Sequence, residues 1–167
     1  MPNVRMKSDE IRFKQNGASC FELNALSSRS RTVWAGTPGY FDGYLEQSRY
    51  LIEIDDAYLI SNWVWVGLIT IDGKEVVFGF FGLKIRDDQE KVLDHFWIEP
   101  TYMHRGLGRL LFEKALEVMR ELGWGRFLIY ADPPAEGFYL KMGATRIGEV
   151  PSRIEGGPIF PAMEMKV

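Results

Sequence analysis

Two long apolar segments joined by a tight turn constrain the fold of this chain more than any other feature. The segments are WVWVGLITI at 63–71 and EVVFGFFGLKI at 75–85, and both are rich in β-branched and aromatic residues. Asp72 and Gly73 lie between them, and Asp-Gly is a strong signal for a two-residue hairpin turn. The pattern therefore predicts an antiparallel pair of strands at the start of a sheet.

Later segments extend this sheet. VLDHFWIEP at 92–100 predicts a third strand that ends at Pro100, and GRFLIYAD at 125–132 predicts another. A helix over 105–122 connects them, because apolar residues recur on one of its faces and Gly123 suits its end. ATRIGEV and FPAMEMKV, separated by the loop PSRIEGGPI, predict a final antiparallel pair. A strand, a crossing helix and a neighbouring strand indicate a mixed α/β sheet.

The front of the chain predicts helices. Ser19 is a good N-cap for a helix over 20–34, and Pro38 suits the first turn of a second helix that carries residues 39–52. Residues 55–61 predict a further helical turn. Near the other end, Asp132 is expected to cap a short helix that begins with two prolines and ends at Gly143.

Composition and charge exclude several classes of protein. A chain of 167 residues suits one domain, which we expect to span 1–167. The net charge is -3 without a block of lysine and arginine, so no nucleic-acid partner is expected. The single cysteine, Cys20, excludes an internal disulfide and fits a reducing compartment. The run at 63–71 is too short to span a bilayer, and MPNVRMKSDEIRFK lacks a signal-peptide core. We therefore expect a cytoplasmic protein without a membrane partner.

The start of the helix at 105–122 carries Gly106 and Gly108 between Arg105 and Arg109. Glycines weaken a helix, but at its N-terminus they let an anion approach unpaired N–H groups at the positive end of the dipole. Leu111 stands where a dinucleotide fingerprint needs its third glycine, and no P-loop GK[ST] sequence is present. The alternative is a plain turn with solvated arginines.

The context resolves this choice through a resemblance. FWIEPTYMHRGLGRLL, followed by LIYADPPAEGFYLKMGA, resembles the GNAT superfamily of acyl-coenzyme A-dependent N-acetyltransferases over about residues 76–150. The family's [Q/R]-x-x-G-x-[G/A] signature falls on residues 103–108, where Met103 departs from the usual Gln or Arg. The resemblance implies an α/β fold with a mixed, mostly antiparallel central sheet, a splayed strand pair and flanking helices.

The resemblance also implies acetyl-CoA as co-substrate, with its pyrophosphate on the glycine-rich helix start and its pantetheine arm along the third strand of the sheet. The residues expected to contact it are Phe96, Trp97, Ile98, Met103, His104, Arg105, Gly106, Leu107, Gly108, Arg109, Asp132 and Tyr139. No metal is expected, because two histidines and one cysteine form no ligand-spaced cluster.

Acetyl transfer to an amine requires a neutral nucleophile, a stabilised oxyanion and a proton for the departing thiolate. Tyr139 occupies the position where many family members place their acid. Asp94 and His95 are the candidate bases, and as neighbours on a strand they are expected on opposite faces, so that one alone faces the site. His95 has the better unperturbed pKa, Asp94 would need a raised one, and solvent could replace both.

The acceptor site is predicted from the front of the chain. Trp34 and Tyr40 could cover an acceptor, Asp42 could hold a cationic amine, and Arg153 in the loop at 151–159 could reach an acidic group, although packing explains the aromatics equally well. We expect an N-acetyltransferase acting directly on a primary amine of a small molecule or peptide. The alternative is a non-catalytic acyl-CoA-binding or sensing module, and a homodimer is left open.

Overall fold

The computed structural model describes residues 10–167. Residues 1–9, which belong to the stretch expected to lack a signal-peptide core, lie outside the described part. Within the described part, seven strands form one sheet in the order β1-β2-β3-β4-β5-β7-β6. The strands are β1 (Ile11–Gln15), β2 (Trp63–Ile71), β3 (Lys74–Ile85), β4 (Lys91–Ile98), β5 (Arg126–Tyr130), β6 (Thr145–Pro151) and β7 (Ile159–Lys166).

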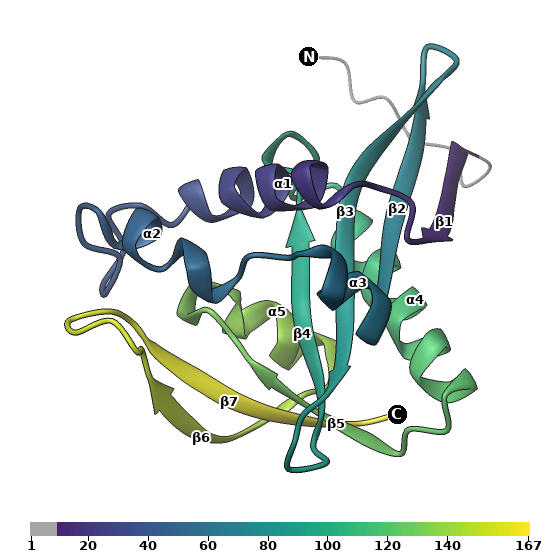
Figure 1. Cartoon of the computed structure of the whole chain (residues 1–167). Helices are drawn as coiled ribbons and strands as arrows, with labels where there is room; N and C mark the ends of the chain where they lie inside the picture. The colour runs from purple at the N-terminus through teal and green to yellow at the C-terminus, as the bar shows by residue number, and fades with distance from the viewer. Residues whose placement is uncertain (1–9) are drawn as a thin grey trace.

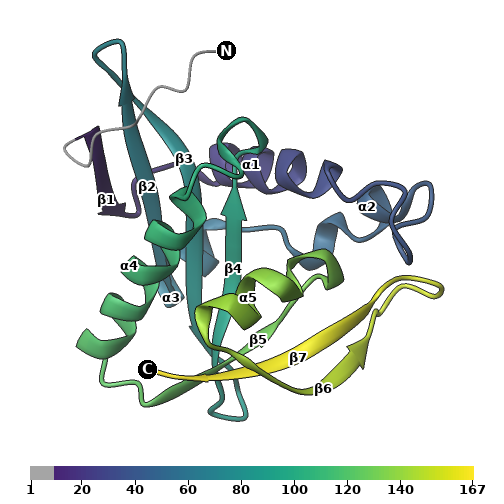
Figure 2. The same cartoon turned by 180° about the vertical axis from the view of Figure 1, so that it is seen from behind.

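Neighbouring strands are antiparallel except for β4 and β5, which are parallel and joined by α4 (Leu107–Glu121). Figure 1 shows α1 (Cys20–Thr32), α2 (Tyr44–Gln47) and α3 (Asp56–Ser61) in front of the sheet. Figure 2 shows α4 and α5 (Glu136–Met142) on the opposite face. The predicted mixed, mostly antiparallel sheet with flanking helices is confirmed.

Each face of the sheet has its own core. On the face of α1 and α3, Leu23 and Leu26 of α1 pack with Val64, Val66 and other buried residues. On the opposite face, the amphipathic side of α4 packs on the sheet with α5, through a cluster that includes Phe81, Leu111, Phe112, Phe127 and Tyr139. Helices therefore cover both faces of the sheet.

Within residues 10–167 no helix combines the length and apolar character needed to cross a membrane.

Several local signals in the sequence predict the structure correctly. Asp72 and Gly73 both have positive φ, 49° and 76°, as a tight turn of the predicted kind requires. Ser19 caps α1 in a complete capping box with Glu22. The last strand pair is the β6–β7 hairpin. These features depend on neighbouring residues, which explains why the sequence reveals them.

The second helix predicted over 39–52 is wrong in most of its length. Gly36, Gly39 and Gly43 have φ values of 82°, 85° and 86°, which a right-handed helix does not permit. The segment instead forms turns, then α2 and a 3-10 turn at Arg49–Leu51. β1, which pairs with β2, was not predicted from the sequence, because its five residues alternate over too short a length.

Candidate active site

A cleft of about 490 Å³ opens where β4 and β5 diverge. Val92 and Leu128 are the pair in register between these parallel strands, and beyond it the strands separate. Residues from both faces of the sheet line the cleft: Ser30, Trp34, Leu93, Asp94, Phe96, Trp97, Ile98, Met103, His104, Gly106, Gly108, Arg109, Ile129, Tyr130, Ala131, Asp132, Ala135, Phe138, Tyr139 and Lys141. The cleft is therefore bordered by elements from both faces of the sheet.

A bulge in β4 changes which way its side chains point. Gly82 of β3 pairs with His95 and Leu83 pairs with Leu93, so Asp94 has no partner on β3. Leu93 belongs to the core on the α4 face. His95, two residues on, contacts Phe80 on the α1 face instead. Because of the extra residue, the side chains of Leu93 and His95 point to opposite faces of the sheet, although residues two apart on a regular strand point to the same face.

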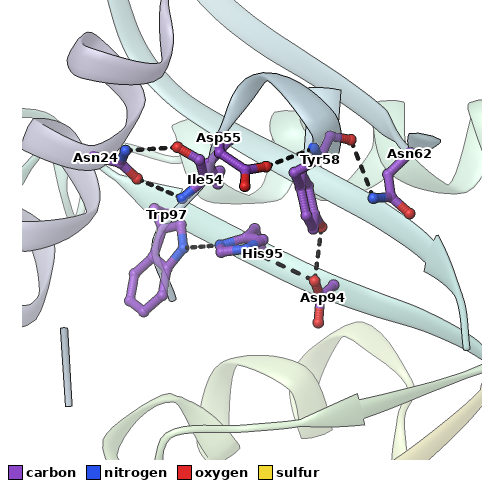
Figure 3. A network of polar contacts seen from close by, with 8 residues as sticks. All are labelled: Asn24, Ile54, Asp55, Tyr58, Asn62, Asp94, His95 and Trp97. Atoms are coloured by element: carbon purple, nitrogen blue, oxygen red, sulfur yellow. Dashed lines mark hydrogen bonds and ion pairs between the residues drawn. The ribbon is translucent and has the colours of Figure 1, made fainter. Parts of the chain in front are cut away.

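The expectation that Asp94 and His95 lie on opposite faces is therefore wrong. The Tyr58 hydroxyl donates a hydrogen bond of 2.7 Å to Asp94 Oδ2, and His95 Nε2 lies 3.7 Å from the same oxygen (Figure 3). Both side chains approach Tyr58 of α3, because the bulge interrupts the alternation on which the expectation rested. Asp94 lines the cleft, whereas His95 is buried behind it.

The hydrogen bond from Trp97 determines the protonation of His95. Trp97 Nε1 donates to His95 Nδ1 at 3.0 Å (Figure 3). An indole nitrogen can only donate, so Nδ1 is the unprotonated nitrogen and Nε2 carries the proton of the neutral ring. Burial also lowers the pKa of His95, against the opposing effect of Asp94. His95 is thus held neutral, with its basic nitrogen already occupied.

The N-terminus of α4 is open to the cleft. Gly106 is the N-cap in the left-handed conformation with φ of 80°, and no side chain caps the helix. His104 also has positive φ, 61°, so the chain curves twice before the helix begins. Gly106 and Gly108 line the cleft, while the side chain of Leu107 is buried. Unpaired N–H groups and the positive helix end make this an anion site.

The two arginines beside this helix start are exposed and can reorient. Arg109 Nε lies 3.0 Å from Glu113 Oε1 one turn along the helix, and its neighbour Arg105 lies over the ring of Tyr102. Neither contact buries the guanidinium. Met103 and His104 line the cleft between the end of β4 and the helix. Five of the predicted phosphate-binding residues therefore line the cleft, whereas Arg105 and Leu107 do not.

The part of β4 beyond the bulge borders the cleft along its free edge. The side chains of Phe96 and Ile98 turn towards α4 and α5, where Phe96 lies 5.6 Å from Phe138 between ring centroids. Trp97 points to the α1 face, into the other core. All three line the cleft, and past Val92 no residue of β5 is in register with the β4 backbone. That backbone can pair with an extended ligand.

Tyr139 of α5 lies in the wall of the cleft. Its ring contacts Phe96, Phe112 and Phe138, with centroids 5.3 to 6.1 Å apart. Burial raises the pKa of Tyr139, and the charge of Asp132 adds to the effect. Among the described residues, none forms a hydrogen bond with its hydroxyl. The phenol hydroxyl is therefore free to donate to a ligand in the cleft.

Asp132 does not cap a helix as expected. It precedes the 3-10 turn at Pro133–Ala135 without a side-chain capping bond, and its Oδ1 accepts a hydrogen bond from the Tyr40 hydroxyl. Burial raises the pKa of Asp132, while Tyr40 and the buried Arg31 oppose the shift. Tyr40 itself is buried, and burial and Asp132 raise its pKa. Asp132 lines the cleft, and Tyr40 supports it from the α1 side.

Of the other predicted acceptor residues, Trp34 lines the cleft and Asp42 and Arg153 do not. Trp34 lines the cleft, with its ring 5.9 Å from those of Tyr40 and Trp97. Asp42 and Arg153 are exposed and are not among the residues that line it. The loop at 151–159 packs against the segment after α1, where a Cβ on Gly39 would lie 2.6 Å from Pro158 Cα. This packing accounts for the length of the loop.

Sequence reasoning missed several residues of this site, among them Ser30, Lys141 and Tyr58. Ser30 and Lys141 line the cleft, and Tyr58 donates to Asp94. Ser30 follows α1 periodicity towards β4, but a serine on a helix gives no functional signal. The contact of Tyr58 with Asp94 joins residues 36 apart in sequence through a bulge that no local pattern reveals. In residues 10–167, no cluster of three His, Cys, Asp or Glu side chains could hold a metal ion.

Comparisons with known proteins agree with this geometry. The model of the acetyltransferase (GNAT) family matches residues 31–144. A GCN5-related N-acetyltransferase from Rhodopseudomonas palustris shares the fold with a TM-score of 0.74 and 18% identity, over 93% of this chain and 95% of that one. The PaiA N-acetyltransferase from Thermoplasma acidophilum, solved with coenzyme A, gives 0.67 and 20%, over 94% and 99%. A search of curated sequences gave no match.

Proposed function

Because this chain belongs to the acetyltransferase (GNAT) family, we propose that it moves the acetyl group of acetyl-CoA to the nitrogen of a primary amine, by direct attack and without an acyl-enzyme. One observation carries the proposal: a single cleft is lined by the uncapped start of α4, by the Tyr139 side chain and by the Asp94 carboxylate. We also propose that residues 1–167 form one catalytic domain.

The α4 and α5 face of the cleft would hold the coenzyme. The N–H groups of Leu107, Gly108 and Arg109 at the helix start would bind the pyrophosphate, with Arg105 adding positive charge nearby and His104 lining the cleft beside it. Room for an anion is supported by Gly106, because even a Cβ there would meet nothing within 4 Å. The free edge of β4 at 96–98 would pair with the pantetheine arm, and its N–H groups would stabilise the oxyanion.

Two polar residues of the cleft, Asp94 and Tyr139, would carry the proton transfers. The ammonium gives one proton to Asp94, and the neutral nitrogen then attacks the thioester carbonyl. As the C–S bond breaks, Tyr139 donates its proton to the sulfur and regains one from the nitrogen that becomes the amide. A phenol is protonated at neutral pH, and the Tyr139 side chain lines the cleft, so its proton is available to the sulfur.

We propose Asp94 as the base in preference to His95. The Asp94 carboxylate lines the cleft, whereas the free nitrogen lone pair of His95 is occupied by the indole N–H of Trp97. A second proton on His95 would lie on Nδ1 and face the indole N–H of Trp97, so that two donors would point at each other. His95 would therefore support the bulge, while Tyr58 orients Asp94 through its hydrogen bond.

A thiol-release assay against a panel of primary amines tests the proposed function. Wild-type protein with acetyl-CoA is expected to release coenzyme A in proportion to the amine added, with the acetylated amine detected by mass spectrometry. If acetyl-CoA binds by calorimetry while no amine in the panel increases release, the non-catalytic acyl-CoA-binding module is the better description.

The choice of base predicts which variant loses activity. Asp94→Asn should lower kcat/KM by about 100-fold or more, because the amine loses its proton acceptor in the cleft. His95→Gln, which keeps a hydrogen-bond acceptor for Trp97, should leave kcat/KM close to that of the wild type. The opposite pattern would reverse the assignment. Wild-type activity in both variants would leave deprotonation to solvent.

A further inference from the structure

The two faces of the cleft differ in charge. From the α4 and α5 side, the cationic side chains of Arg109 and Lys141 line it. The two carboxylates that line it, Asp94 and Asp132, are instead hydrogen-bonded to residues of the α1 and α3 side. Within the described part, no lysine or arginine of that side lines the cleft. The site is thus cationic where the coenzyme would lie and anionic on the other side.

Asp132 keeps one carboxylate oxygen without a donor. Its Oδ1 accepts from the Tyr40 hydroxyl, while no described residue donates a hydrogen bond to Oδ2. Arg31, the cation that influences it, is buried and donates to Ser48 Oγ at 2.6 Å rather than to the carboxylate. A half-buried carboxylate with one neutral donor is incompletely solvated, and a cation that enters the cleft would stabilise it.

The surroundings of Asp132 define the chemistry of that cation. Trp34 and Trp97 form an aromatic wall on the same side of the cleft, with ring centroids 5.9 Å apart. Indole faces attract both organic cations and apolar groups. A carboxylate or phosphate on the ligand would meet two fixed carboxylates here without a cationic partner. The surface therefore fits an ammonium attached to an aromatic or apolar group that carries no acid.

We propose that Asp132 binds the ammonium of the acceptor, and that the acceptors are arylalkyl or alkyl amines rather than amino acids. This inference rests on the proposed function, since it specifies the substrate class for the same cleft. Asp132 is then a substrate-binding residue that presents the amine to Asp94. It takes the place that the sequence suggested for Asp42, which lies exposed outside the lining.

Calorimetric titration of the protein saturated with coenzyme A tests this without turnover. Phenethylamine should bind the wild type at least about 10-fold more tightly than phenethyl alcohol or phenylalanine, which lack the charge or add an acid. Asp132→Asn should weaken the binding of phenethylamine by about 10- to 100-fold, the usual range for a hydrogen bond between charged groups. It should leave the affinities for the alcohol and for acetyl-CoA unchanged. Asp87→Asn, in an exposed turn, should leave all of them unchanged.

The outcomes separate the two proposals. If the wild type and Asp132→Asn bind phenethylamine with equal affinity, the inference is overturned while the proposed function stands. Loss of acetyl-CoA affinity in Asp132→Asn has the same consequence, because it would assign Asp132 to the coenzyme site. If Asp132→Asn fails to fold, the comparison of phenethylamine with phenethyl alcohol on the wild type still tests the inference. Equal affinity of the wild type for these two ligands overturns it. Failure of the wild type to acetylate any amine overturns the proposed function and this inference with it.

Discussion

Gly108→Glu is expected to abolish the stabilisation of the protein by acetyl-CoA. Gly108 lines the cleft in the first turn of α4, so a glutamate would place both bulk and negative charge where the pyrophosphate should bind. Acetyl-CoA at 100 times its Kd should add about 2.7 kcal/mol to the free energy of unfolding of the wild type. For a domain of this size that corresponds to a rise in Tm of roughly 5 to 11 °C, measured by thermal denaturation.

The fold of the variant should survive, which makes the test specific. A Cβ on Gly108 would meet the Phe138 ring at 3.5 Å, an ordinary contact, and an acidic residue in a first helical turn is favourable. Gly108→Ala is the matched control and should retain most of the ligand-dependent shift. If Gly108→Glu kept the full shift, the coenzyme phosphates would have to bind elsewhere.

Tyr139→Phe is expected to lower kcat by about 100- to 10,000-fold, the usual range for loss of a general acid. The change removes a hydroxyl that bonds to no described residue, and the ring contacts with Phe96, Phe112 and Phe138 remain. Tm and the affinity for acetyl-CoA should therefore stay close to those of the wild type. Steady-state kinetics on an amine identified in the panel gives the measurement.

Tyr44→Phe provides the matched control, because Tyr44 is equally buried but is not among the residues that line the cleft. It should leave kcat within about twofold, as expected for a substitution away from the reacting groups. An unchanged kcat in Tyr139→Phe would make Tyr139 a packing residue and leave protonation of the thiolate to water.

The elements that the sequence predicts correctly are those encoded by neighbouring residues. The Asp72-Gly73 turn, the Ser19 capping box and the glycine-rich start of α4 each lie within a few positions. The helix predicted over 39–52 is wrong because Pro38 suits the start of a helix, whereas Gly39 and Gly43 after it adopt left-handed φ. A glycine indicates conformational freedom, but its sequence context does not say how that freedom is used.

The polar part of the site was harder to predict, for a different reason. The bulge at Asp94 is a property of the pairing between β3 and β4, so a count of alternating residues along β4 misplaces every side chain beyond it. The hydrogen bond from Tyr40 to Asp132 joins positions 92 apart. A capping role for Asp132 was the natural local reading, but a distant hydroxyl competes for the carboxylate.

The contact between Gly39 and Pro158 couples a loop outside the cleft to a segment that lines it. Pro158 lies so near Gly39 that no side chain fits between their backbones, and Trp34, which lines the cleft, lies five residues before that glycine. If Trp34 contacts the acceptor as proposed, we expect a change of length in the 151–159 loop to alter acceptor preference from outside the site. The loop and the segment after α1 would then have to be exchanged together to transfer that preference to another chain.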